Sequence, residues 1–152
     1  MDRDPSTLIA AVNKALGRTI DWHDYDDRLI MQKGCYILNR WGYGPYYGYG
    51  LYIRGPYSTE LTDDCEGMIL SNLRTDIPEE ALTALSGIIK RGTDYLEAYT
   101  TVMLVKENNP SRNSIAVMKK ALDIRPSLKD LIEEACSLIL TDCRSKTVKR
   151  MF

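Results

Sequence analysis

Residues 34–58 read GCYILNRWGYGPYYGYGLYIRGPYS and hold seven of the ten tyrosines and six of the ten glycines of this 152-residue chain. Glycine permits backbone conformations that other residues avoid, and tyrosine combines a flat apolar ring with a polar tip. Such a segment can bend sharply, pack against a core and present hydroxyl groups together. It therefore separates helical runs before residue 42 from helical runs after residue 58.

Two helices are expected before this segment. The first begins after Asp4 and ends at Gly17, because an acidic cap precedes the apolar stripe and a glycine follows it. The second takes Asp24 or Asp26 as its cap and ends at Gly42. Residues 41–50, WGYGPYYGYG, contain too much glycine for a helix and are expected to form a loop.

After the loop, the alternating residues 49–54 predict a short strand that Gly55 and Pro56 interrupt. Ser58 or Thr59 then caps a third helix, whose apolar stripe extends to Leu73. Apolar periodicity predicts four more helices, over residues 79–91, 95–107, 111–122 and 126–140. Residues 95–104 are apolar on most sides, which is typical of a central, heavily buried helix.

The fold class expected is therefore mainly α, a compact bundle of about seven helices with one short β-strand or hairpin. Residues 1–140 are predicted to form a single helical domain, since the length suits one domain and 44% of the residues are hydrophobic. Residues 141–152 are basic and lack periodicity, so we expect a frayed tail.

Charge and cysteine content exclude few functions. The net charge is −1, but residues 110–152 carry nine basic residues against five acids. That excess fits either solvated helix faces or a nucleic-acid patch.

No CxxC pair occurs, and His23 is not spaced with a cysteine as a zinc ligand would be. We interpret the cysteines as small core residues and expect no metal or cofactor. Without a signal peptide or a long apolar run, a cytoplasmic location is expected. The cysteines are Cys35, Cys65, Cys136 and Cys143.

The tyrosine-rich loop is the leading candidate for an interaction surface. Tyrosines on a glycine-rich scaffold provide contact area with few rotamers to immobilise. No lysine or arginine lies within residues 42–53, which disfavours stacking on nucleic-acid bases. The alternative is that the tyrosines fold back onto the core. The interaction residues predicted are Trp41, Tyr43, Tyr46, Tyr47, Tyr49, Tyr52 and Tyr57.

A polar cluster is expected beside this loop. Gln32, Tyr36 and Arg40 share one helix face, with a lysine at its border. Together with groups from residues 54–58 they could hold a carboxylate or a phosphate. Alternatively, Gln32 and Lys33 hydrogen-bond the carbonyls of the Gly-Pro turn while the tyrosines pack. The cluster comprises Gln32, Lys33, Tyr36, Arg40, Arg54 and Ser58.

No residue carries a catalytic signature. Ser58 does not lie in a nucleophile elbow, and the only imidazole is that of His23, so capping is the expected role of Ser58. The acids around His23 have irregular spacing, and capping and solvation account for them without a metal. They are Asp21, Asp24, Asp26 and Asp27.

The helices expected over residues 111–122 and 126–140 have helix-turn-helix spacing. For reading DNA, the second helix offers Lys129 near its start, but Glu133 and Glu134 follow and would face phosphates unfavourably. Simple helical packing is the default interpretation of this pair, and DNA binding through it is the alternative.

Residues 29–38 (LIMQKGCYIL) and 51–58 (LYIRGPYS) resemble the YwgA-like family of small uncharacterised prokaryotic proteins, and residues 127–135 resemble the last helix of that pattern. The Gln-Lys-x-x-Tyr helix followed by an aromatic segment and Gly-Pro is more distantly similar to the Panacea domain. The resemblance implies a compact helical fold without known enzymatic activity. Panacea proteins are associated with toxin–antitoxin and phage-related systems as protein-binding neutralisers. The loop at residues 41–50 departs from the pattern, being richer in tyrosine and glycine.

Together these observations favour a small cytoplasmic, non-enzymatic protein that binds an unidentified protein partner. The alternative is a DNA-binding or regulatory module that uses residues 111–150. A third hypothesis is an enzyme that binds an acidic or phosphorylated ligand at Lys33, Arg40 and Arg54.

Overall fold

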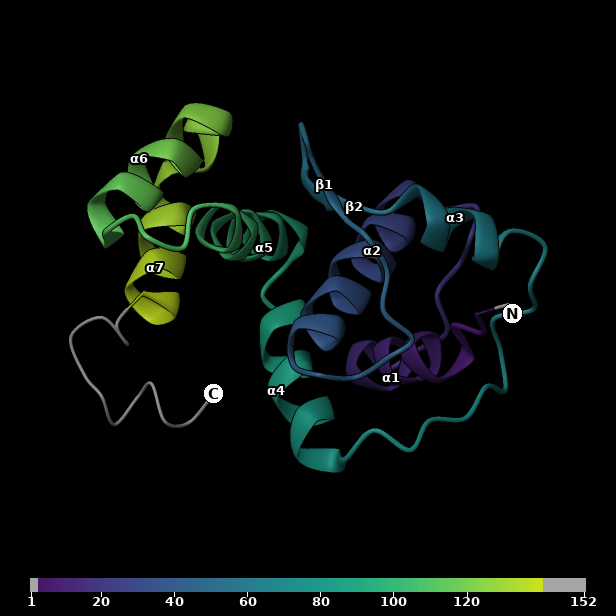
Figure 1. Ribbon diagram of the computed structural model, residues 1–152. Coiled ribbons are helices and arrows are strands. Elements are labelled where there is room, and N and C mark those ends of the chain that lie inside the picture. Colours follow the sequence, from purple (N-terminus) through teal and green to yellow (C-terminus); the bar gives the residue numbers. More distant parts are fainter. Residues whose placement is uncertain (1–2, 141–152) are drawn as a thin grey trace. The chain divides into compact units, whose positions relative to one another are not determined.

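The computed structural model describes residues 3–140, which divide between two compact units (Figure 1). Among these residues, unit 1 contains 3–50 and 57–93, and unit 2 contains 51–56 and 94–140. The predicted basic tail, residues 141–152, lies outside the described residues. The fold is mainly α with one two-stranded hairpin, as predicted. Its elements are α1 (Ser6–Leu16), α2 (Tyr25–Arg40), β1 (Gly50–Tyr52), β2 (Gly55–Tyr57), α3 (Thr59–Cys65), α4 (Glu79–Ile89), α5 (Thr93–Asn108), α6 (Ser114–Ile124), η1 (Pro126–Leu128, a 3₁₀ turn) and α7 (Lys129–Ile139).

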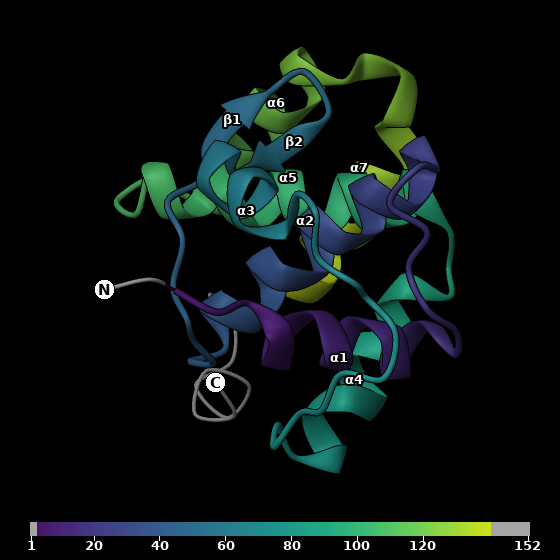
Figure 2. The same cartoon turned by 90° about the vertical axis from the view of Figure 1, so that its right-hand side faces the viewer.

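The core of unit 1 forms where α1 packs against α2 and α4 (Figure 2). Leu8, Ile9 and Val12 of α1 are completely buried there. The approach of α1 to α2 is close at Gly34, where an added Cβ would lie 2.8 Å from Cγ2 of Val12. The glycine therefore allows two helices to meet at a distance that a larger side chain would prevent.

Local signals set three of the helix ends of unit 1 as the sequence predicts. Gly17 ends α1 in the left-handed conformation, with φ of 87°. The Asp24 side chain caps α2 by accepting a hydrogen bond from the backbone N–H of Asp27 at 3.0 Å. Ser58 caps α3 in the same way, through the N–H of Leu61 at 3.2 Å. The capping role predicted for Ser58 is thus confirmed.

The prediction that the third helix continues to Leu73 is wrong. Helix α3 ends at Cys65, and the chain turns at Gly67, whose φ is +82°. Beyond that turn the apolar side chains no longer share one face, and Ile69 is exposed. The spacing of apolar residues alone therefore did not locate the end of α3. The turn at Gly67 determines it.

Unit 2 is built around α5, which is buried over most of its length as predicted. Its small and β-branched residues Ala98 and Val102 pack with Val117 and Ala121 of α6. Helix α7 completes the same cluster, with Ile132, Ala135 and Cys136 as its buried residues.

The face predicted for α6 is wrong in part. The helix starts at Ser114, where Asn113 accepts a hydrogen bond from the N–H of Ala116 at 2.9 Å. Val117 and Ala121 then face the core, and Ile115, which was expected to point inward, is exposed. Val117 and Ala121 lie four residues apart and share one face of the helix, and this face makes the core contacts.

Candidate functional site

The tyrosine-rich loop, residues 41–50, is held by the buried amide of Asn39 near the end of α2. Its Nδ2 donates to the carbonyls of Tyr43 and Pro45 at 2.7 and 2.9 Å. Its Oδ1 accepts from the backbone N–H of Tyr47 at 3.0 Å and from the Tyr49 hydroxyl at 3.3 Å. One side chain thus satisfies main-chain groups along much of a loop that has no regular secondary structure.

Tyr47 lies in the core of unit 1, only 4% exposed. Its hydroxyl donates to Asp64 of α3 at 2.7 Å, and the guanidinium of Arg3 lies 4.5 Å from its ring centroid. Burial, and then the hydrogen bond to Asp64, raise the pKa of Tyr47 well above its usual value. This position contradicts the prediction that Tyr47 presents its ring to a partner: its hydroxyl acts as a structural donor.

Tyr49 is also folded back onto unit 1. Its ring meets that of the fully buried Tyr36 edge to face, with centroids 5.0 Å apart. Arg40 lies over both rings, at 4.7 Å from the Tyr36 centroid and 5.7 Å from the Tyr49 centroid. Burial raises the pKa of Tyr49 well above its usual value. Two members of the predicted polar cluster, Tyr36 and Arg40, therefore form an aromatic–cation stack with this loop residue.

The other aromatic residues of the predicted interaction set divide by exposure. Trp41, Tyr43 and Tyr57 are half-buried, and the Tyr57 hydroxyl shares a hydrogen bond of 2.7 Å with Thr62. Tyr46 is exposed, and its hydroxyl donates to the carbonyl of Gly42 at 2.6 Å. The alternative in which loop tyrosines fold back onto the core thus describes Tyr47 and Tyr49 but not Tyr46 or Tyr52.

The hairpin of β1 and β2 carries the most exposed apolar residues of the aromatic segment. Leu51, Tyr52 and Ile53 are 36%, 51% and 80% exposed. Ile53 and Arg54 form the turn, and Gly55 follows with φ of +94°, the position at which three-residue hairpin loops place a left-handed glycine. The predicted strand is thus the first half of a hairpin, and residues 55–57, expected to interrupt it, form the second.

Gln32 of α2 is bound to the backbone that follows the hairpin. Its Nε2 donates to the Ser58 carbonyl at 3.0 Å, and its Oε1 accepts from the Ser58 N–H at 2.9 Å. The same Nε2 lies 2.8 Å from Oγ1 of Thr62. Gln32 therefore has a structural role, but its backbone partner is Ser58 and not the carbonyls of the Gly-Pro turn that were predicted. Lys33 is likewise buried in α2.

Arg54 belongs to unit 2, whereas Lys33 and Arg40 belong to unit 1. Within unit 2 its Nε lies 2.8 Å from Oε1 of Glu97, a completely buried residue of α5. The other carboxylate oxygen of Glu97 pairs with Nη1 of Arg125. These contacts form an Arg–Glu–Arg triad in which the central carboxylate is buried and the two arginines are partly exposed. Sequence reasoning missed its centre, although an acid inside the apolar stretch 95–104 is a signal that could have identified it.

The helix pair of unit 2, α6 and α7, exposes acidic as well as basic side chains at the start of its second helix. The turn η1 precedes α7, and the exposed residues at the start of α7 are Lys129 and Asp130, with Glu133 one turn later. Arg125, between the helices, is paired with Glu97. Much of the predicted basic excess lies in residues 141–152, outside the described part of the chain.

The acids near His23 have structural roles. Arg18 donates to both oxygens of Asp27, at 2.6 and 2.8 Å, and the N–H of Asp21 donates to the same carboxylate at 2.8 Å. The hydrogen bonds from Arg18 hold the pKa of Asp27 below its usual value. Within residues 3–140, no group of three or more histidine, cysteine or acidic side chains could hold a metal ion.

The cysteines described by the structure are free and buried. Burial raises the pKa of the Cys65 thiol to about 12 and that of Cys136 to about 11, and it raises the pKa of Cys35 strongly. These thiols are therefore protonated at neutral pH and poor nucleophiles. Cys143 lies outside the described residues.

Comparison of the chain with protein-family models, curated proteins and solved structures yields no match. Among residues 3–140, no helix combines the length and the apolar character needed to cross a membrane.

Proposed function

We propose that this protein is a non-enzymatic module that binds another protein through its hairpin tip, residues 51–53. The observation that carries the proposal is the exposure of three consecutive large apolar side chains. Turns normally use glycine, proline, asparagine, aspartate or serine, and an isoleucine that is 80% exposed contributes little to folding. Such a residue is better explained by a contact made with a partner.

The chemistry of the tip suits a protein surface. Tyr52 supplies a rigid aromatic ring, of the type enriched at the centres of interfaces, and Leu51 and Ile53 add aliphatic area on either side. The hairpin is fixed in unit 2 by the pairing of Arg54 with Glu97, so little ordering is required on binding. The resemblance to the YwgA-like and Panacea group supports the same class of function, a protein-binding neutraliser of the toxin–antitoxin or phage-related kind. A cytoplasmic setting fits the free thiols of Cys35, Cys65 and Cys136.

The experiment is a pull-down of the tagged chain from the cells that produce it, with co-purifying protein and nucleic acid both identified. The double variant Tyr52→Ser, Ile53→Asn should lose the protein partner. With the purified partner, we expect affinity to fall by about 30-fold, which corresponds to about 2 kcal/mol for a central contact.

Ile69→Asn provides the matched control, because Ile69 is 78% exposed but lies outside the hairpin. It should retain the partner with unchanged affinity. A folded double variant that still binds the partner would exclude the hairpin tip as the contact surface. Recovery of nucleic acid without protein would instead favour the alternative function, DNA binding through the basic residues 111–150.

A further inference from the structure

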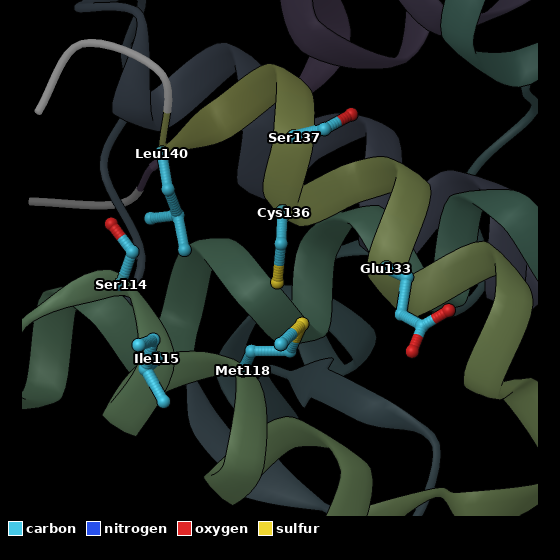
Figure 3. Close-up of a pocket in the computed structure, with 7 residues that line it drawn as sticks. All are labelled: Ser114, Ile115, Met118, Glu133, Cys136, Ser137 and Leu140. Carbon is cyan, nitrogen blue, oxygen red and sulfur yellow. The ribbon is translucent and has the colours of Figure 1, made fainter. Parts of the chain in front are cut away.

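A groove of about 240 Å³ lies between α6 and α7 in unit 2 (Figure 3). Its lining is mostly apolar, with Ile115 and Met118 from α6 and Cys136 from α7, and Glu133 is the one charged residue among those that line it. Sites for drug-sized ligands usually measure about 300–1,000 Å³. This groove is smaller, and its lining does not indicate the chemistry of an occupant.

A larger and more polar groove, of about 380 Å³, lies in unit 1 along one face of α4 beside α1. Its volume is within the range of small-molecule sites. The α4 residues that line it recur at helical spacing, so they form a single stripe along the helix. The lining consists of Lys14 of α1 with Glu79, Leu82, Thr83, Ser86, Gly87 and Lys90 from α4 and its end.

Gly87 is a residue of this groove that packing within the chain does not explain. Glycine is unfavourable inside a helix, because it loses more backbone entropy on folding than alanine does. Gly34 is explained by its close approach to Val12, whereas an added Cβ at Gly87 would meet nothing within 4 Å. Because Gly87 lines the groove, a side chain at this position would reduce the space in it.

Two lysines from different helices line the same groove. Lys14 lies in the last turn of α1, and Lys90 follows the last residue of α4. A cation offsets the partial negative charge of a helix C-terminus, which favours lysine at both positions but does not require a groove. Among the described residues, neither ammonium group has an ion-pair or hydrogen-bond partner. Both positive charges of the groove are therefore available to an anionic ligand.

The one acid of the groove, Glu79, lies at the opposite end of α4 from Lys90. Eleven residues separate the two, or about 16 Å along the helix axis, so they do not neutralise one another directly. The hydroxyls of Thr83 and Ser86 and the buried side chain of Leu82 lie between them along the helix. The groove thus combines cations, hydroxyl donors and an apolar surface.

We propose that this groove binds a small molecule through a phosphate group, which Lys14, Lys90 and the Thr83 hydroxyl contact. Lysine binds phosphate as a point charge, and a hydroxyl can donate to a further phosphate oxygen. In a phosphate monoester, the organic part then lies over Leu82 and beside the backbone of Gly87. This site is independent of the hairpin tip, which belongs to unit 2.

Adenosine monophosphate is the probe, with inorganic phosphate and adenosine as its two parts. On titration of the isotope-labelled full chain at constant ionic strength, we expect saturable shifts of the Thr83, Ser86 and Gly87 amides in proton–nitrogen correlation spectra. Tighter binding of adenosine monophosphate than of phosphate would assign the site to a monoester, and equal affinity would assign it to free phosphate. Shifts that do not saturate, or that adenosine reproduces, would overturn the proposal.

Substitutions test the charges and the space separately. Lys14→Gln and Lys90→Gln should each weaken binding of adenosine monophosphate about fivefold, the effect of one exposed charge contact. Gly87→Leu should abolish the saturable shifts, because the leucine side chain would occupy the groove. Leucine also favours a helix more than glycine does, so this variant should keep its fold.

Lys119→Gln is the matched control, because Lys119 is an exposed lysine of α6 that does not line the groove. It should leave the affinity unchanged. Equal weakening by Lys119→Gln and Lys14→Gln would show unspecific attraction by charge and would overturn the proposal. Unaltered binding by a folded Gly87→Leu variant would do the same, since the ligand would then lie elsewhere.

Discussion

At Asn39, one side-chain amide holds most of the tyrosine-rich loop through four hydrogen bonds. Removing it would leave the carbonyls of Tyr43 and Pro45 without these donors in a partly buried setting. We expect Asn39→Ala to lower the free energy of unfolding by about 2–4 kcal/mol, measured by urea denaturation. The exposed Asn108 offers the comparison: Asn108→Ala should change stability by less than about 0.5 kcal/mol. Equal effects of the two substitutions would show that the loop does not depend on this amide.

A second prediction concerns Asp27 and pH. Hydrogen bonds from Arg18 depress the pKa of Asp27 in the folded state below the 3.8 expected without them. The pair therefore contributes its full stability above that value and loses it as the pH falls through the lower, folded-state pKa. Urea denaturation from about pH 6 to about pH 2 should show a loss of about 1–3 kcal/mol that is absent in Asp27→Asn. Asp26→Asn, at an exposed neighbouring position, should keep the acid-dependent loss; parallel curves for wild type and Asp27→Asn would contradict the prediction.

Some roles of single residues could be predicted from the sequence, and others could not. Caps such as Ser58 were predictable, because they act on backbone groups only a few residues away. Asn39 was not identified, because its partners are set by the path of an irregular loop rather than by a local pattern. The sequence also could not show that Tyr52 is exposed while Tyr47 is buried, since both lie in the same segment rich in tyrosine and glycine.

At the scale of elements, two glycines inside helices should respond oppositely to the same substitution. Gly34 of α2 is buried against Val12, and an added Cβ would approach Cγ2 to 2.8 Å. Gly87 of α4 is exposed, with nothing within 4 Å of an added Cβ. We expect Gly34→Ala to destabilise the protein by about 1–3 kcal/mol and Gly87→Ala to stabilise it by about 0.5–1 kcal/mol.

Thermal and urea denaturation of both variants would test this pair. Adding Val12→Ala to Gly34→Ala should recover part of the lost stability only if the clash is with that side chain. Destabilisation by both glycine substitutions would instead mean that α1 and α2 do not depend on this close contact.

The helices themselves were largely predictable, and their ends and faces were less so. Periodicity located the buried α5, because an apolar surface on most sides leaves no choice of face. For α6 it indicated Ile115 as a core residue, because it could not show that the face of Val117 and Ala121 is the one that packs against the core. The end of α3 was placed too late, because the turn at Gly67 lies within an apolar pattern that continues beyond it.

For the whole molecule, the path of the chain links the two units. Unit 2 includes residues 51–56, which lie in the middle of the sequence of unit 1. Neither unit is therefore one continuous stretch of chain. Arg54, from that short segment, pairs with Glu97 of α5, and Gly50 and Tyr57 at the two ends of the hairpin belong to unit 1. Loss of structure in unit 2 should release the hairpin, whose ends belong to unit 1, so we expect residues 1–140 to unfold together.

This prediction can be tested because both tryptophans, Trp22 and Trp41, belong to unit 1. Glu97→Gln removes the charge between two arginines in unit 2 and should cost on the order of 3 kcal/mol. If the chain folds as one domain, the urea midpoint detected by tryptophan fluorescence should fall together with the midpoint detected by circular dichroism. Asn108→Ala, an exposed change on the same helix, should shift neither midpoint. A lower circular-dichroism midpoint with an unchanged tryptophan midpoint would show that the units unfold independently, because the damage would then be confined to unit 2.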